Sequence, residues 1–463
     1  MNNRYIKHLL IAGVIVLSFA SCKVTQKYKS AGLSTDGLYR DINSSDTSTM
    51  ADIPLKEFFT DPELLKLLDE GISQNLDLKI AITRIQQSEA YLRQSKAALF
   101  PSLNANASAT VSKLSDGQGG RLINNTRVYQ LGLTSSWEAD IWGKLSSSKR
   151  ANLAALLESR AYARAVQTRL VANIANTYYQ LLALDQQLAI TQQSVQNWIS
   201  TVETMKALKE GAIVTGAAVV QTEASRYAAE VTIPDIKQNI RETENALSIL
   251  LGRNPGPVVR SSLEQQKQIT AVSPGIPAQL LSNRPDVQQA ELNFRYYFES
   301  TNVARSYFYP ALTITASGGL SNTTLQDFFS AGSVFGNLVG GLTQPIFNQR
   351  ANRTRYEVAK AAQQEALLSF KSTLLTAGQE VSDALSSYQT AIDKQSSRSS
   401  QISALEKSVA YSQDLLKSGF ANYTEVLNAQ QSLLSAQLNR VNDQLQEFQS
   451  TVELYRALGG GWR

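Results

Sequence analysis

The sequence contains one long pattern twice, at an offset of roughly 208 residues. In each copy an aromatic-proline pair precedes an alternating stretch, and a very long helical run follows. Four landmarks correspond between the copies: Phe100-Pro101 with Tyr309-Pro310, Trp142-Gly143 with Phe347-Asn348, Gly211 with Gly419, and Leu251-Gly252 with Leu458-Gly459. A repeat of this length indicates a duplicated structural unit. We expect a first repeat at residues 61–257, a linker at residues 258–280 and a second repeat at residues 281–463.

The first residues have the pattern of an export signal. Two basic residues precede a short apolar stretch, Leu9 to Ala20, which is too short to span a bilayer as a helix. The following Ala20-Ser21-Cys22 resembles the lipobox of bacterial lipoproteins, with Phe19 where leucine is commoner. We expect residues 1–21 to be a lipoprotein signal peptide, Cys22 to be lipidated and residues 22–60 to form an extended tail. The alternative is an ordinary signal peptide that is cleaved near a chance cysteine.

The residue counts exclude several classes of function. The single histidine is His8 and the single cysteine is Cys22, so the mature chain lacks imidazole and has at most one thiol. Ser-His-Asp and Cys-His catalysis and histidine- or cysteine-based metal sites are therefore excluded, and we expect no cofactor. The formal charge of +5 (44 basic minus 39 acidic residues) is too small and too scattered for nucleic-acid binding.

Two stretches in each copy alternate with period two. In the first copy Leu103, Ala105, Ala107, Ala109 and Val111 alternate with Ser and Asn residues, and Tyr129, Leu131, Leu133 and Trp137 alternate with Gln, Gly, Thr and Ser. In the second copy the stretches are 312–317 and 335–343. Such alternation over about ten residues is typical of a tilted transmembrane β-strand. The alternative is a soluble hairpin on a core, but its inner face would carry larger apolar side chains.

The segments between these strands predict unusually long helices. The stretch from Lys144 to about Lys209 has neither proline nor glycine, and the same holds from Gln349 to about Gly378, after which we expect the helix to continue to Ser418. About sixty-five helical residues reach about 100 Å. Apolar residues recur every three to four positions in these runs, as in a coiled coil. None has eighteen consecutive apolar residues, so none is a transmembrane helix.

Four strands per chain cannot close a barrel, and lipid does not tolerate open strand edges. Two chains would supply eight strands, about the size of a barrel that side chains fill completely. Three chains would supply twelve strands and leave room for a lumen. We therefore expect a homotrimer.

Four motifs in order carry a family resemblance. They are Trp137-Glu138-Ala139-Asp140-Ile141-Trp142-Gly143-Lys144, the segment from Ser282 to Glu291 with Asn283-Arg284-Pro285-Asp286, Gln344-Pro345-Ile346-Phe347, and Leu458-Gly459-Gly460-Gly461-Trp462. Together they resemble the TolC-like outer-membrane efflux factors, in their lipoprotein branch. The segment from Asn283 to Asp286 also has the pattern of a helix start, with Pro285 in the first turn. We therefore expect Arg284 to have a structural role and not to bind substrate.

The resemblance implies an α+β membrane protein. Its fold would be a trimeric twelve-stranded outer-membrane β-barrel, continuous with a long periplasmic α-helical coiled-coil barrel. It further implies a passive exit duct for drugs or other small toxic compounds in a Gram-negative outer membrane. The partners would be a periplasmic adaptor protein, an inner-membrane pump of the RND type and outer-membrane lipid. Lys23 after the cysteine, where aspartate would favour the inner membrane, agrees with that location.

The resemblance also implies where the duct narrows. Gly211 and Gly419 would form the periplasmic tip turns, with glycine supplying the left-handed helix cap. Thr424, Glu425, Asn428 and Gln431 share a helical face and would line the constriction. In relatives, by this resemblance, arginine often stands at the position of Gln431 or of Ala421 and forms an ionic lock between helices; neither arginine is present here. The alternative is that Glu425 is merely solvated on a helix surface.

Two other functions remain to be compared with the duct. A periplasmic coiled-coil adaptor lipoprotein would also have long helices and a lipid anchor, but it predicts lipoyl-like hairpins instead of two pairs of alternating strands. A carbohydrate-active enzyme with paired carboxylates is disfavoured, because the acidic residues are dispersed along helices.

Overall fold

The computed structural model describes residues 24–40, 47–113, 125–267 and 273–463. The chain forms two compact units that interleave along the sequence. The first comprises residues 1–32, 84–160 and 289–370, and the second comprises residues 33–83, 161–288 and 371–463. Each unit therefore takes segments from both halves of the chain.

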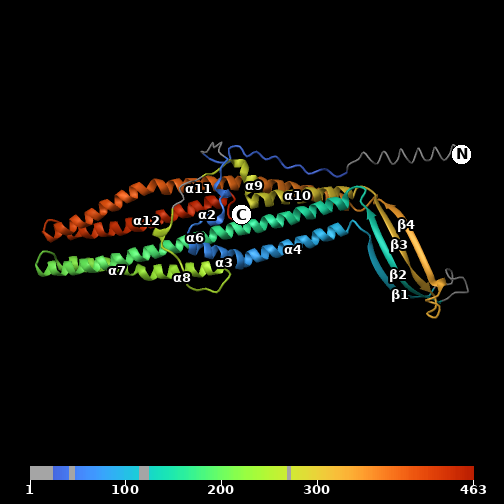
Figure 1. Cartoon of the computed structure of the whole chain (residues 1–463), viewed down its shortest axis with the longest axis horizontal. Helices are drawn as coiled ribbons and strands as arrows, with labels where there is room; N and C mark the ends of the chain where they lie inside the picture. The colour runs from blue at the N-terminus through green and yellow to red at the C-terminus, as the bar shows by residue number, and fades with distance from the viewer. Residues whose placement is uncertain (1–23, 41–46, 114–124, 268–272) are drawn as a thin grey trace. The chain divides into compact units, whose positions relative to one another are not determined.

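The first unit contains one antiparallel sheet of four strands in the order β1-β2-β3-β4 (Figure 1). The strands are β1 Ser102–Lys113, β2 Asn125–Ala139, β3 Ala311–Asn322 and β4 Val334–Thr343. The central β2–β3 ladder joins strands from the two halves of the chain, for example Leu131 opposite Leu320. All four predicted strands are thus present and pair consecutively.

The register separates the two faces of the sheet by polarity. Residues directly opposite one another share a face. One row across the four strands is Ala107, Leu131, Leu320 and Val334, and a row on the other face is Asn104, Thr134, Ser317 and Asn337. A sheet with an apolar face and a hydroxyl- and amide-lined face is the pattern of an outer-membrane barrel wall.

β1 and β4 are the edge strands of this sheet. Each pairs with a neighbour on one side only, so the other side presents free backbone N–H and C=O groups. Large apolar side chains on these strands are also uncovered within the chain, with Leu103 68% and Leu338 74% exposed. The isolated chain therefore leaves both strand edges and much apolar surface without a partner.

Helices account for most of the remaining chain. Their bounds are α2 Leu55–Phe58, α3 Pro62–Gln74, α4 Leu76–Ala97, α6 Lys144–Glu210, α7 Gly216–Glu230, α8 Thr232–Leu250, α9 Leu280–Asn283, α10 Pro285–Ser306, α11 Ala351–Lys417 and α12 Tyr423–Ala457. Short 3-10 turns are η1 Met50–Asp52, η3 Leu263–Gln265, η4 Pro277–Gln279 and η5 Ala331–Ser333. α6 and α11 have 67 residues each. Within the described residues no helix has the length and apolarity needed to cross a membrane.

The motif at the end of β2 starts α6 and fixes the turn between them. Both carboxylate oxygens of Asp140 accept backbone N–H groups of the first turn, from Leu145 and Ser146 at 2.8 Å each. The indole of Trp142 donates to the carbonyl oxygen of Pro310 at 2.7 Å. An acidic cap at a helix N-terminus is stabilising, so this part of the motif has a structural role.

Arg284 has the structural role that the sequence predicts. Its side chain is only 3% exposed, and its guanidinium donates to Asp286 at 3.0 and 2.5 Å and to the carbonyl oxygen of Ala457 at 2.9 Å. It also pairs with Glu380 at 2.7 Å. Burial alone would raise the pKa of Asp286, but the hydrogen bonds and positive charge of Arg284 outweigh it and lower the pKa. The group ties the start of α10 to α11 and α12.

The register predicts opposite outcomes for two adjacent positions of β2. We expect Leu131→Arg to destabilise membrane insertion by about 2–4 kcal/mol, because Leu131 lies on the apolar face near the middle of the strand. Gln130→Arg, on the polar face, is the matched control and should insert normally. Heat-modifiable migration of outer-membrane fractions measures both, and equal losses for the two variants would contradict the facial assignment.

Candidate functional site

Two hairpin turns in the second unit hold the residues expected at the constriction. The first connects α6 to α7, and the second connects α11 to α12 (Figure 1). In the second turn Gly419 has a left-handed φ of 77°. Its N–H donates to the carbonyl oxygen of Leu416 at 3.0 Å, and that of Phe420 donates to Leu415 at 2.9 Å. This is a Schellman cap, and it satisfies carbonyl groups at the end of α11.

The first turn has the same cap, but Gly211 is not its left-handed residue. That residue is Ala212, with φ of 56°. Ala212 donates to Lys209 at 3.0 Å and Ile213 donates to Leu208 at 2.9 Å, which matches the pattern at Gly419. The prediction that Gly211 supplies the left-handed cap was therefore wrong: it lies in the turn, one position earlier.

The correct alignment was available in the sequence. Leu251 and Leu458 close the two halves at an offset of 207, as 458 minus 251, and this offset places Gly419 on Ala212. The helix ends at these leucines have the same cap, with Gly252 at φ of 70° and Gly459 at φ of 95°. Of these four caps, Ala212 alone places a side chain in the left-handed region, where it costs about 1–2 kcal/mol.

The start of α12 separates buried from exposed side chains. Val426 (0% exposed) packs with Met205, and Leu427 (4%) packs with Trp198, in two apolar clusters that join the hairpins. Glu425, Asn428 and Gln431 are exposed on the helix, and Thr424 is half-buried. In the single chain the four predicted residues therefore lie away from these clusters and form a polar, largely solvent-facing surface.

Glu425 also has a local structural position. Asn422 caps α12, and its side-chain oxygen accepts the N–H of Thr424 at 3.2 Å. Glu425 follows in the first helical turn, where a carboxylate interacts favourably with the helix dipole. A helix-start role and a constriction role are compatible, because the side chain itself remains exposed.

The two hairpins are joined by neutral hydrogen bonds. Tyr423 donates its hydroxyl to Gln221 of α7 at 3.1 Å, and Gln430 donates its amide to Thr201 of α6 at 2.9 Å. The ion pairs of Lys206 with Glu203 (3.1 Å) and Glu223 (3.5 Å) lie within the first hairpin. Gln431 and Ala421 add no charge to this surface.

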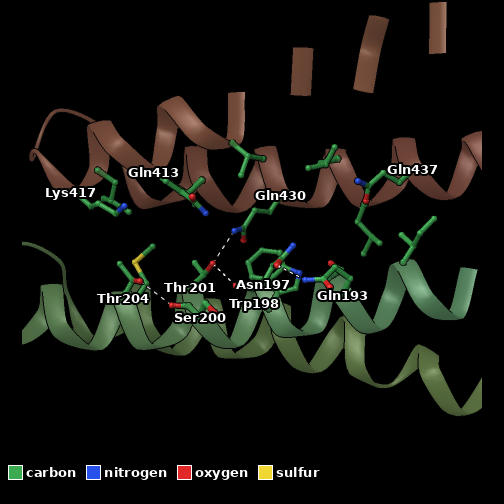
Figure 2. A pocket seen from close by; sticks show the side chains of 18 residues that line it. Gln193, Asn197, Trp198, Ser200, Thr201, Thr204, Gln413, Lys417, Gln430 and Gln437 are labelled. Carbon is green, nitrogen blue, oxygen red and sulfur yellow. Dashed lines mark hydrogen bonds between the residues drawn. The ribbon is translucent and has the colours of Figure 1, made fainter. Parts of the chain in front are cut away.

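A cavity of about 500 Å³ lies between α6 and the α11–α12 pair (Figure 2). Its floor is apolar and includes Trp198, Met205, Leu416 and Leu433, and its walls carry the amides of Gln193, Asn197, Gln413, Gln430 and Gln437. Lys417 lies at one end in Figure 2. This volume and mixed lining fit the docking of an amphipathic segment or a small molecule.

Gln430 is the residue of this region that the sequence did not indicate. It is 8% exposed, and its carbonyl oxygen has no hydrogen-bond partner. Only the helical face with Glu425 and Asn428 was considered in the sequence, whereas Gln430 lies on the opposite, buried face. A glutamine among core positions of an amphipathic helix was the available signal.

Cys22, the predicted site of lipidation, lies outside the described residues.

These features define a class of protein: a chain with a sheet of barrel-wall pattern, very long helices and helical hairpins with capped tips. The family model described as outer membrane efflux protein matches the sequence twice, at residues 67–253 and 276–460. The chain belongs to this family. It is an exit channel for efflux and resides in the outer membrane, so its class is transport rather than catalysis.

Two curated relatives illustrate the range of this family. The solvent efflux pump outer membrane protein SrpC of Pseudomonas putida is 30% identical over 412 residues, which cover 88% of this chain and 87% of the relative. The cation efflux system protein CusC of Escherichia coli O6:H1 is 27% identical over 467 residues, which cover 98% and 99%.

A solved channel has the same fold. The open state of the MtrE outer membrane channel of Neisseria gonorrhoeae superposes with a TM-score of 0.85 at 24% identity, covering 96% of this chain and 99% of MtrE. The predicted fold class, with four strands and long helices per chain, is confirmed.

The caps predict opposite effects at two corresponding positions. We expect Ala212→Gly to stabilise the folded chain by about 1 kcal/mol, because it relieves a left-handed alanine, and Gly419→Ala to destabilise it by a similar amount. Gly211→Ala is the control, since its Cβ would meet no atom closer than 3.7 Å. The midpoint of thermal unfolding measured by circular dichroism tests all three. A lower midpoint for Ala212→Gly would contradict the cap assignment.

Proposed function

We propose that three copies of this chain form a passive duct, with one continuous twelve-stranded barrel in the outer membrane. The two open edges of the four-stranded sheet support this proposal most directly. β1 and β4 run antiparallel to their neighbours, so β4 of one copy can pair with β1 of the next without breaking the alternation. Three sheets of four strands then give a closed barrel with a lumen. The two halves of the chain, residues 61–257 and 281–463, form the two structural repeats, with residues 258–280 between them.

The duct requires partners that supply energy and connect it to the inner membrane. We assign these roles to an inner-membrane pump of the RND type and a periplasmic adaptor protein. The cavity beside Trp198 and Gln430 supports the docking of an adaptor, because its apolar floor and amide walls suit an amphipathic helix. The tip turns and the polar face with Glu425 form the entrance.

The cargo class that the chain fits best is small organic compounds, and the name of SrpC gives solvents as the cargo of that relative's pump. Soft metal ions prefer thiolate, thioether and imidazole ligands. In the described chain the methionines are Met50 and Met205, which are 1% and 0% exposed. Within those same residues no group of three His, Cys, Asp or Glu side chains could hold a metal ion. The transport path therefore offers a soft cation little to bind.

We further propose that Cys22 carries the lipid anchor. Residues that follow it are held along α10, where Asn302 exchanges two hydrogen bonds with the backbone of Gln26 (3.0 and 2.9 Å) and Arg305 donates to Val24 at 3.3 Å. These contacts hold Val24 and Gln26, among the first described residues after Cys22, beside the last turns of α10. Mass spectrometry of the purified protein should show a diacylglyceryl adduct on Cys22. An unmodified N-terminus at another residue would refute this.

The efflux function predicts a gain of resistance. A strain that lacks its own exit channels but expresses the cognate pump and adaptor should regain tolerance to toluene when it receives this chain, and should gain no tolerance to copper or silver. The protein purified from it in mild detergent should have the native mass of three chains. A mass of one or two chains would refute the trimer, and metal tolerance without solvent tolerance would refute the cargo class.

The exposed acid on α12 predicts ion selectivity at the entrance. Three copies of Glu425 would form an acidic ring that attracts cations. We expect Glu425→Gln to reduce the cation preference of the pore and Asn428→Asp, on the same face one turn later, to increase it. Reversal potentials in planar bilayers under a salt gradient measure both. Unchanged potentials in both variants would show that Glu425 is solvated outside the lumen.

A further inference from the structure

One ion pair occupies the end of the barrel wall where β2 leads into α6. Nζ of Lys144 lies 2.7 Å from both carboxylate oxygens of Glu138. The side chains of Glu138 and Lys144 are 30% and 23% exposed. The family motif at residues 137–144 contains both residues, and its other polar groups have structural partners: Trp137 donates to Leu99, Trp142 to Pro310, and Asp140 caps α6. The pair is therefore the part of the motif without an assigned role.

The register places Glu138 on the polar face of the sheet. It stands opposite Thr313, which stands opposite Gly341, and it follows Thr134 and Ser136 at intervals of two. In an outer-membrane barrel this face lines the lumen. Glu138 is the one charged residue that the four described strands place on this face, since the others there are hydroxyl, amide, glycine, alanine, valine and phenylalanine residues.

Two cations share one aromatic ring beside Glu138. Lys144 also lies over the ring of Tyr307, with Nζ 5.0 Å from its centroid, and the guanidinium of Arg355 lies 4.0 Å from the same ring. Asp140 lines a small cavity at this junction together with Glu138, Lys144 and Tyr307. Lys144 is the cation that contacts Glu138 directly.

We propose that the Glu138–Lys144 pair neutralises the only charge in the described wall of the barrel lumen, so that the barrel does not select its cargo by charge. This inference rests on the proposed trimeric duct and deepens it. Neutral and amphiphilic organic molecules of either sign would pass the barrel equally well, and charge selection would be confined to the helical entrance. An uncompensated ring of three acids would otherwise concentrate cations at this level.

The test is a double-mutant cycle on Glu138 and Lys144. All variants also carry Glu425→Gln, which removes the acidic ring proposed at the entrance. We expect Lys144→Gln to expose three Glu138 side chains and raise the potassium-to-chloride permeability ratio by roughly twofold or more. Glu138→Gln should lower the ratio by a similar factor, and the double variant should return to the parent ratio. Reversal potentials of the purified protein in planar bilayers give these ratios. Lys66→Gln breaks the exposed Lys66–Glu63 pair on α3 and serves as the control.

Opposite shifts in the two single variants, cancelled in the double variant, would establish the proposal. Unshifted ratios, or shifts in the same direction, would overturn it and show that the pair only clamps the turn before α6. If a single variant fails to assemble, the exchanged pair Glu138→Lys with Lys144→Glu decides: a parent-like ratio supports compensation, and a shifted ratio refutes it. A parent protein that forms no conducting pore would overturn the proposed duct itself, and the inference with it.

Discussion

The unpaired edges of a four-stranded sheet are the constraint on which the rest of the structure depends. A bilayer offers no water to the free N–H and C=O groups of β1 and β4, and each unpaired group costs several kcal/mol there. The chain can therefore enter the membrane only as part of a closed assembly. Closure with a lumen in turn makes the polar face of the sheet an inner wall, and this gives Glu138, Thr134 and their neighbours their place in transport.

Much of the architecture could be predicted because its signals are periodic. Alternation with period two identified the strands. A run without proline or glycine identified α6, and a similar run interrupted only by Gly378 identified α11. These features depend on residues near one another in sequence, so the sequence alone carries them.

The site could be predicted only in part, because it depends on register and on contacts between distant segments. An offset of 208 instead of 207 assigned the left-handed cap to Gly211, although Ala212 has it. The buried face of α12, with Gln430 bonded to Thr201 at a separation of 229 residues, has no local signature. The exposed face with Glu425 could be recognised from helical spacing, but spacing does not show which surface faces a lumen.

The β2–β3 ladder has a consequence for how such a channel assembles. A chain with only one repeat would bring two strands, so six separate chains would be needed for a barrel of twelve. In the fused chain this ladder, with pairs such as Leu131 and Leu320, forms within one molecule. A barrel of six strand pairs has six ladders that join one pair to the next. Three of these ladders thereby become intramolecular and form at the high effective concentration set by a covalent link. Fusion therefore reduces the assembly of the barrel from an association of six chains to an association of three.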